Sequence, residues 1–167
     1  MDPNRVLLGK RLLIVDDERD ILETLIGLLI VCKIDPASSF EEAKKLLEQY
    51  KYDLVVLDIM GVKGFDLLEI ANKRDTPALM LTAHSLNTES LMKSVRQGAA
   101  YFVPKEKMAE IGTYIADVLK AKESNKNPWI RWLERLGSFF DTTFTGPNWR
   151  TQEENFMERL KRLGSGL

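Results

Sequence analysis

The sequence predicts an α/β fold, a doubly wound five-stranded parallel sheet followed by a C-terminal helical extension. Short apolar runs alternate with longer segments whose apolar residues recur at helical spacing, and this alternation is typical of a parallel sheet with helices on both faces. Polar side chains follow directly on several of these runs, where buried strands would end. The chain has 167 residues, of which 44% are hydrophobic, enough for one domain of ordinary size with a small appendage.

The first half of the chain supplies two strands and two helices. Leu12–Val15 is a wholly apolar run and predicts the first strand, and the helical spacing of isoleucines and leucines in Asp20–Cys32 predicts the first helix. A weaker second strand is expected near Asp35–Ala37. Ser39–Gln49 predicts a helix because its opening serine, followed three residues later by Glu42, resembles a capping box.

The middle of the chain continues the alternation. Leu54–Leu57 is strongly apolar, and we expect it to be the central strand. Phe65–Asn72 predicts a short helix with leucine and alanine side chains available for burial, and Ala78–Leu81 predicts the next strand. The pattern of β/α units is thereby maintained.

The last two elements of the predicted domain are a strand and a helix that follow a glycine. Leu86–Gln97 predicts a helix that ends at Gly98, because a residue without a side chain suits the left-handed stop position. About Ala100–Val103 we expect the fifth strand, and Lys107–Lys122 predicts the closing helix. Five β/α units therefore account for residues 1–122.

A polar linker, residues 123–128, separates this domain from an amphipathic helical extension, residues 129–167. An apolar stripe of helical period opens the extension, and a second short helix is expected at Thr151–Leu163. The stripe consists of Trp129, Trp132, Leu133, Leu136, Phe139 and Phe140. It could cover an apolar patch on its own domain, or it could form a homodimer or dock a helix of a downstream protein. We do not expect DNA binding, because the extension lacks the basic face of a DNA reader.

Composition and charge narrow the function classes further. The net charge of −1 gives no long-range reason to expect nucleic acid or an anionic membrane as the main partner. No apolar run approaches the roughly 20 residues that span a bilayer, and the first residues lack the basic and apolar regions of a signal peptide. We therefore expect a cytoplasmic protein without membrane contact.

Three carboxylates are predicted to meet at one edge of the sheet. Asp16 and Asp17 close the first strand, and Asp58 closes the central one; if these strands are neighbours, mutual repulsion of the carboxylates calls for a cation. We expect Asp17 and Asp58 to hold Mg²⁺ together with the backbone carbonyl of Met60, while Asp16 helps through water. Asp58 is the natural nucleophile toward phosphorus, because it ends the central strand.

Two further polar residues follow later strands and suit phosphoryl chemistry. Thr82 follows the fourth strand directly, and Lys105 comes one residue after the fifth. A mobile ammonium and a hydroxyl at the same sheet edge can bind the equatorial oxygens of a phosphoryl group. The sequence therefore predicts a catalytic set of Asp58, Thr82 and Lys105 beside a magnesium site.

These residues resemble the receiver domain of two-component response regulators. The resemblance covers roughly Lys10 to Lys122 and rests on four segments in the right order, LLIVDDERD, DLVVLDIM, ALMLTAH and GAAYFVPK. It implies a flavodoxin-like sheet of strand order 2-1-3-4-5. It also implies a phosphoprotein that signals through protein–protein contacts and receives its phosphoryl group on Asp58, with magnesium, from a histidine kinase or phosphotransfer protein.

The resemblance also implies a switch. Thr82 would move toward the phosphoryl oxygen, and Phe102, which stands where tyrosine is common in the family, would turn inward. The output surface would be the face formed by the fourth helix, the fifth strand and the fifth helix.

Two departures from the family pattern leave alternatives open. The loop after Asp58 is shorter than usual and lacks its proline, and Pro104 precedes Lys105 instead of following it. One alternative is a degenerate interaction module that works without phosphorylation. Another is a magnesium-dependent phosphatase that forms an aspartyl phosphate, but such enzymes usually carry a second aspartate two residues after the nucleophile, where Met60 stands here. We therefore expect a signalling protein and not a turnover enzyme.

Overall fold

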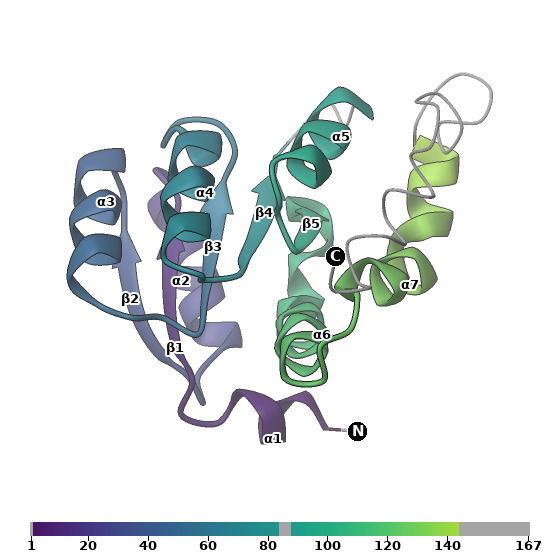
Figure 1. Cartoon of the computed structure of the whole chain (residues 1–167), viewed down its shortest axis with the longest axis horizontal. Coiled ribbons are helices and arrows are strands. Elements are labelled where there is room, and N and C mark those ends of the chain that lie inside the picture. Colours follow the sequence, from purple (N-terminus) through teal and green to yellow (C-terminus); the bar gives the residue numbers. More distant parts are fainter. Residues whose placement is uncertain (1, 84–87, 144–167) are drawn as a thin grey trace.

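The computed structural model describes residues 2–83 and 88–143, and the predicted helix at Thr151–Leu163 lies outside them. Five parallel strands form one sheet in the order β2-β1-β3-β4-β5, which confirms the predicted fold class (Figure 1). In chain order the strands are β1 (Arg11–Val15), β2 (Lys33–Ala37), β3 (Leu54–Asp58), β4 (Ala78–Thr82) and β5 (Tyr101–Pro104).

Helices cover both faces of the sheet. In Figure 1, α3 and α4 lie in front of the sheet and contact each other, whereas α2 lies behind it and contacts α6. The helical elements are α1 (Pro3–Leu7), α2 (Arg19–Leu28), α3 (Phe40–Gln49), α4 (Gly64–Lys73), α5 (Thr88–Arg96), the 3₁₀ segment η1 (Lys105–Glu110), α6 (Ile111–Glu123) and α7 (Pro128–Thr143). None of the helices in the described part of the chain is long and apolar enough to cross a membrane.

The central strands β1, β3 and β4 are unbroken apolar runs in the sequence because both of their faces are buried. All five residues of β3 and all five of β4 are buried, since helices cover the sheet on both sides. Ser39 caps α3 as predicted, because its hydroxyl accepts a hydrogen bond from the backbone NH of Glu42 at 3.2 Å.

The helices differ from the prediction in three main ways. The helix expected at Asp20–Cys32 ends at Leu28, because the chain must reverse before β2 begins at Lys33. The closing helix is split into η1 and α6. The short helix α1 was not predicted; its first turn is capped by Asp2, whose carboxylate accepts a hydrogen bond from the NH of Asn4.

The apolar stripe after the linker forms α7 and packs onto its own domain, the first of the two alternatives above. Trp129, Trp132 and Phe140 are each at most 1% exposed. Their rings contact the two successive β5 residues Tyr101 and Phe102, with centroids 6.4 Å apart for Tyr101–Trp129 and 5.8 Å apart for Phe102–Phe140. Because successive strand residues point to opposite faces, α7 lies along the outer edge of β5 and its rings reach residues of both faces (Figure 1).

Hydrogen bonds fix the two indole rings of α7 in place. The Nε1–H group of Trp129 donates to the Ala99 carbonyl at 3.1 Å, and that of Trp132 donates to the Phe102 carbonyl at 2.8 Å. An aromatic side chain buries about 150–250 Å², so at about 25 cal/mol per Å² the two indoles contribute on the order of 10 kcal/mol of apolar burial. The α7 helix is therefore held firmly on the sheet.

An ion pair joins α6 to α7 beside these rings. The carboxylate of Asp117, 4% exposed, accepts hydrogen bonds from the Arg135 guanidinium and, at 3.1 Å, from the hydroxyl of Tyr101. Burial and the Asp117 carboxylate both raise the pKa of Tyr101, which stays protonated and can donate this bond. Strand β5, α6 and α7 thus meet at one buried carboxylate.

Candidate functional site

The structure brings the three predicted carboxylates together at the carboxyl ends of β1 and β3. Val15 of β1 is in register with Leu57 of β3, so Asp16 and Asp58, the next residue of each strand or loop, lie side by side. A carboxylate oxygen from each of Asp16, Asp17 and Asp58 lies within 4.8 Å of the other two. Asp16 and Asp58 are buried, whereas Asp17 is exposed.

Lys105 reaches this cluster from the carboxyl end of β5, which β4 separates from β3. Its Nζ atom lies 2.9 Å from Oδ2 of Asp16 and 3.4 Å from Oδ1 of Asp58, and its side chain is only 10% exposed. Pro104, in the trans form, ends β5, and Lys105 begins η1. The reversed order of proline and lysine therefore does not keep the ammonium out of the site.

The electrostatics of the site favour a bound cation. Burial raises the pKa of Asp58 to about 7, the charge of Asp16 adds to this rise, and Lys105 opposes it. The pKa of Asp16 is also raised, chiefly by burial, against the opposing effects of Lys105 and the backbone NH of Glu18. Burial lowers the pKa of Lys105, but its contact with Asp16 and the charge of Asp58 outweigh that, so the pKa is raised and the ammonium stays charged.

The donor set fits a hard divalent cation. The Oδ2 atom of Asp16 is buried and, apart from the Lys105 ammonium 2.9 Å away, no donor among the described residues reaches it. Carboxylate oxygens are the ligands that Mg²⁺ prefers in proteins. A cation beside these three groups would neutralise the negative charge that one lysine leaves in excess.

Thr82 lies next to the cluster, and the remaining predicted residues take different positions around it. Thr82 ends β4 directly after Leu81, which is the register partner of Asp58. The side chain of Met60 is 75% exposed in the loop after β3, and its carbonyl remains a predicted ligand. Phe102, on β5, is fully buried, and its ring packs against Phe140.

The short loop after Asp58 depends on two glycines that approach the site closely. A Cβ atom on Gly61 would lie 2.6 Å from Oδ2 of Asp17, and one on Gly64 would lie 2.3 Å from the carbonyl oxygen of Asp58. Gly61 also has a φ of +82°, a conformation that favours glycine. The shortened loop therefore closes directly onto the carboxylates.

Glu18 is a member of the site that sequence reasoning missed. Its carboxylate lies 3.8 Å from Nζ of Lys105 and is largely exposed, and its backbone NH donates to Oδ1 of Asp16 at 2.8 Å. The only signal was its position directly after the two aspartates. Asp16 thus binds the backbone NH of the residue before α2 through Oδ1, while Oδ2 faces the cluster.

The sequence is similar to those of several known proteins. The family model described as the response regulator receiver domain matches residues 12–116. The two-component response regulator ARR18 of Arabidopsis thaliana is 38% identical over 104 residues, which cover 58% of this chain and 16% of that protein. The transcriptional regulatory protein YvrH of Bacillus subtilis is 32% identical over 126 residues, 70% of this chain and 53% of that protein.

Solved structures show the same fold. The receiver domain of the Francisella response regulator 1452 superposes with a TM-score of 0.62 at 23% identity and covers 68% of this chain and 99% of that one. The signal receiver domain of a LuxO repressor protein from Vibrio parahaemolyticus gives a TM-score of 0.62 at 25% identity, over 68% of this chain and 92% of that one.

Proposed function

The chain belongs to the response regulator receiver domain family, and on that premise we propose that it accepts a phosphoryl group on Asp58 from a histidine kinase or phosphotransfer protein. The proposal rests mainly on one observation: Asp16, Asp17 and Asp58 form one cluster, and the Lys105 ammonium lies 3.4 Å from Asp58. The chain spans about a sixth of the plant regulator and about half of the Bacillus one. The activities of those whole proteins are therefore not assigned to it.

The proposed step is a phosphoryl transfer from nitrogen to oxygen. A carboxylate oxygen of Asp58 bonds to phosphorus, the bond from phosphorus to the donor's imidazole nitrogen breaks, and that nitrogen recovers a proton. Lys105 supplies positive charge to the phosphoryl oxygens, and Thr82 offers a hydroxyl from the neighbouring strand. For this, the Lys105 ammonium must shift from Asp16 toward the transferred phosphoryl group.

The three carboxylates would hold Mg²⁺, together with the backbone carbonyl of Met60. Bound there, the ion would neutralise charge that otherwise repels the phosphoryl donor. Asp17 is the exposed member, so it lies where a cation would enter.

We propose a signalling role and not catalytic turnover. A phosphatase that uses an aspartate nucleophile needs an acid near its leaving group. The residue two positions after Asp58 is Met60, a thioether that is 75% exposed. Without that acid, the phosphorylated state would be long-lived enough to act as a signal.

Phe102 is the proposed relay from the site to the rest of the molecule. It lies on β5, which leads directly to Lys105, and its ring packs against Phe140 of α7. Since α7 leaves the ring no exposed position, any turn of Phe102 must be accommodated by α7. The proposed signal therefore passes into the C-terminal helix, in a protein that we place in the cytoplasm with its kinase.

Incubation with acetyl phosphate and Mg²⁺, followed by intact mass, tests the proposal. We expect one added phosphoryl group in the wild type, none in Asp58→Asn, and an unchanged adduct in Asp66→Asn, which removes an exposed carboxylate from α4. Absence of an adduct in the wild type with every donor would favour an interaction module that works without phosphorylation. Rapid multiple turnover of a phosphate ester would favour the phosphatase.

A further inference from the structure

The α7 helix covers the outer edge strand β5, which would otherwise be open to partners. It buries Trp129, Trp132 and Phe140 on β5 and pairs Arg135 with the buried Asp117. Coupling between two sites in a protein typically changes an equilibrium by roughly 5- to 150-fold. A change of that size is too small to release α7 from the sheet, because release would expose all three buried rings and break the ion pair. The α7 helix is thus a permanent part of the domain, and a partner that approaches from this side meets its outer surface.

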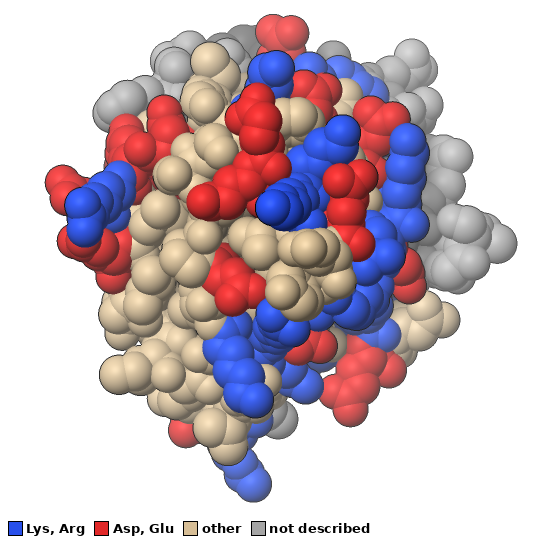
Figure 2. Space-filling view, turned by 90° about the vertical axis from the view of Figure 1, so that its left-hand side faces the viewer, with Lys and Arg blue, Asp and Glu red and all other residues tan. Residues whose placement is uncertain are grey.

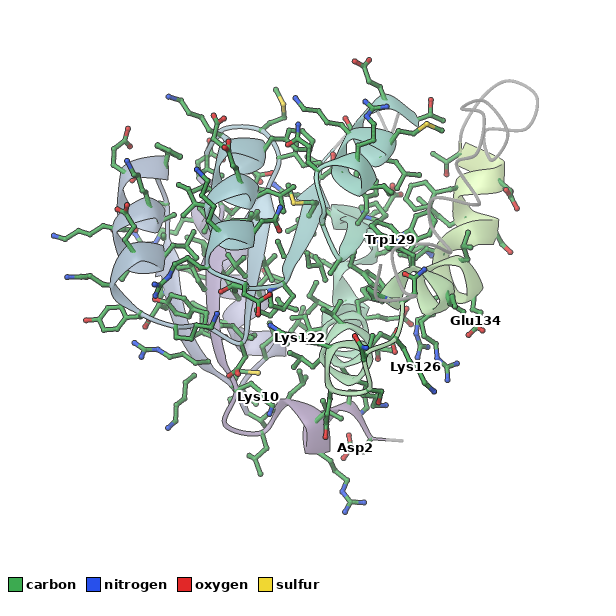
Figure 3. All side chains as sticks on the ribbon, in the orientation of Figure 1. Asp2, Lys10, Lys122, Lys126, Trp129 and Glu134 are labelled. Atoms are coloured by element: carbon green, nitrogen blue, oxygen red, sulfur yellow. The ribbon has the colours of Figure 1, made fainter. Side chains whose placement is uncertain are left out.

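That outer surface contains a hollow between α6 and α7. Its volume is about 770 Å³, and its walls carry charged side chains of both helices. Ile130, 53% exposed, provides an apolar contact within it. Figure 3 shows Trp129 pointing from α7 toward the sheet, with Lys126 at the turn between α6 and α7 and Glu134 along α7.

The charges of the hollow do not cancel. Its two acids are each matched by an arginine, Asp117 by Arg135 and Glu134 by Arg131 at 2.9 Å. Lys120 and Lys126 also line the hollow, and neither makes a side-chain hydrogen bond or ion pair with another described residue. Two unmatched ammonium groups therefore flank an exposed isoleucine.

We propose that this hollow binds an acidic segment of a partner protein, with carboxylates against Lys120 and Lys126 and an apolar side chain on Ile130. Positive charge without internal partners favours an acidic ligand and speeds its association. The apolar contact gives the complex a component that salt does not screen. The face around α3 offers no such combination, since positive and negative side chains are interleaved on it (Figure 2). The proposal does not depend on phosphoryl transfer at Asp58.

Fluorescence anisotropy with the full chain tests the proposal. The probe is a labelled 14-residue peptide of glutamate and leucine with the leucines at helical spacing. The charge reversal Lys120→Glu with Lys126→Glu should weaken binding at least about tenfold. The matched reversal of two exposed lysines on α3, Lys44→Glu with Lys45→Glu, should change it less than about twofold.

Ile130→Ser tests the apolar part of the proposed contact, because it changes no charge. It should weaken binding about threefold at high and low salt alike. Equal weakening by the two lysine pairs would show unspecific attraction and overturn the proposal, as would absence of binding at about 1 mM probe. Self-association of the wild type that Lys120→Glu with Lys126→Glu abolishes would assign the hollow to a second copy of the chain and would equally overturn it.

Discussion

The ammonium nitrogen of Lys105 lies 3.4 Å from Oδ1 of Asp58 and 2.9 Å from Oδ2 of Asp16, so one cation serves two buried carboxylates. A third carboxylate, that of Asp17, is the exposed member of the same cluster. The site therefore holds more negative than positive charge, and its behaviour should depend on protons and on divalent cations.

The stability of the metal-free protein should depend on Asp58 between pH 4 and pH 7. Its folded pKa of about 7 lies above the ordinary value near 3.9, so the unfolded chain loses the proton first and stability falls as the pH rises through this window. We therefore expect the free energy of unfolding of Asp58→Asn, relative to that of the wild type, to rise by on the order of 2 kcal/mol between pH 5 and pH 8. Urea unfolding in a chelating buffer measures this; an unchanged difference at the two pH values would contradict it, and Asp66→Asn serves as the control.

Magnesium should stabilise the wild type. An ion that binds the folded state at about 100 times its dissociation constant adds about 2.7 kcal/mol to the free energy of unfolding. Asp17→Asn should weaken the binding by about tenfold or more, because it removes one carboxylate of the cluster. Thermal unfolding against Mg²⁺ concentration gives both numbers, and an equal rise of Tm in Asp58→Asn would place the ion elsewhere.

The loop after β3 should not tolerate a side chain at Gly64. A Cβ atom there would meet the carbonyl oxygen of Asp58 at 2.3 Å and the Cα atom of Ile59 at 2.8 Å, so Gly64→Ala must shift the backbone of Asp58, the proposed phosphoryl acceptor. We expect a loss of about 2 kcal/mol and weaker Mg²⁺ binding. Gly27→Ala is the matched control, because nothing lies within 4 Å of its added atom and alanine favours the helix by up to about 1 kcal/mol.

The packing of α7 should contribute strongly to stability. Phe140→Ala removes a fully buried ring from contact with Phe102 and should cost about 3–5 kcal/mol. Ile130→Ala on the same helix, at a side chain that is 53% exposed, should change stability by less than about 0.5 kcal/mol. Equal unfolding midpoints for the two variants in urea would show that α7 is only loosely attached.

The two arginine ion pairs of α7 should contribute unequally to the free energy of unfolding. Arg135→Gln leaves the buried Asp117 with the Tyr101 hydroxyl as its main partner, and we expect a loss of about 1–2 kcal/mol after allowance for the partial exposure of the arginine. Arg131→Gln breaks an exposed pair with Glu134 and should cost at most about 0.5 kcal/mol. Comparing the free energies of unfolding at low and high salt checks both values.

Much of the fold could be predicted because burial on both faces produces apolar runs, as in β3 and β4, that end at recognisable polar residues. The same logic placed Asp16, Asp58 and Lys105 together, since parallel strands bring their carboxyl ends to one edge. The end of α2 was predicted too late, because residues 29–32 are as apolar as the helix before them and only the requirement to reach β2 stops the helix.

Tertiary contacts decided what the sequence left open. The aromatic stripe after residue 128 has the same pattern whether it covers its own domain or another protein. The choice depends on contacts that lie about 30 residues apart along the chain, such as Trp132 with Phe102. The approach of Glu18 to Lys105 is likewise a long-range contact with no local periodicity to indicate it.

The two outermost strands of the sheet are protected against pairing with other molecules in different ways. Strand β2 carries Pro36, which cannot donate a ladder hydrogen bond, and charged Lys33 and Asp35, features that discourage aggregation at an open border. Strand β5 carries no charge, and only its last residue is proline. Its protection comes from α7, so a chain that stopped at residue 127 would keep the carboxylate cluster but expose an uncovered aromatic strand edge to intermolecular β-pairing.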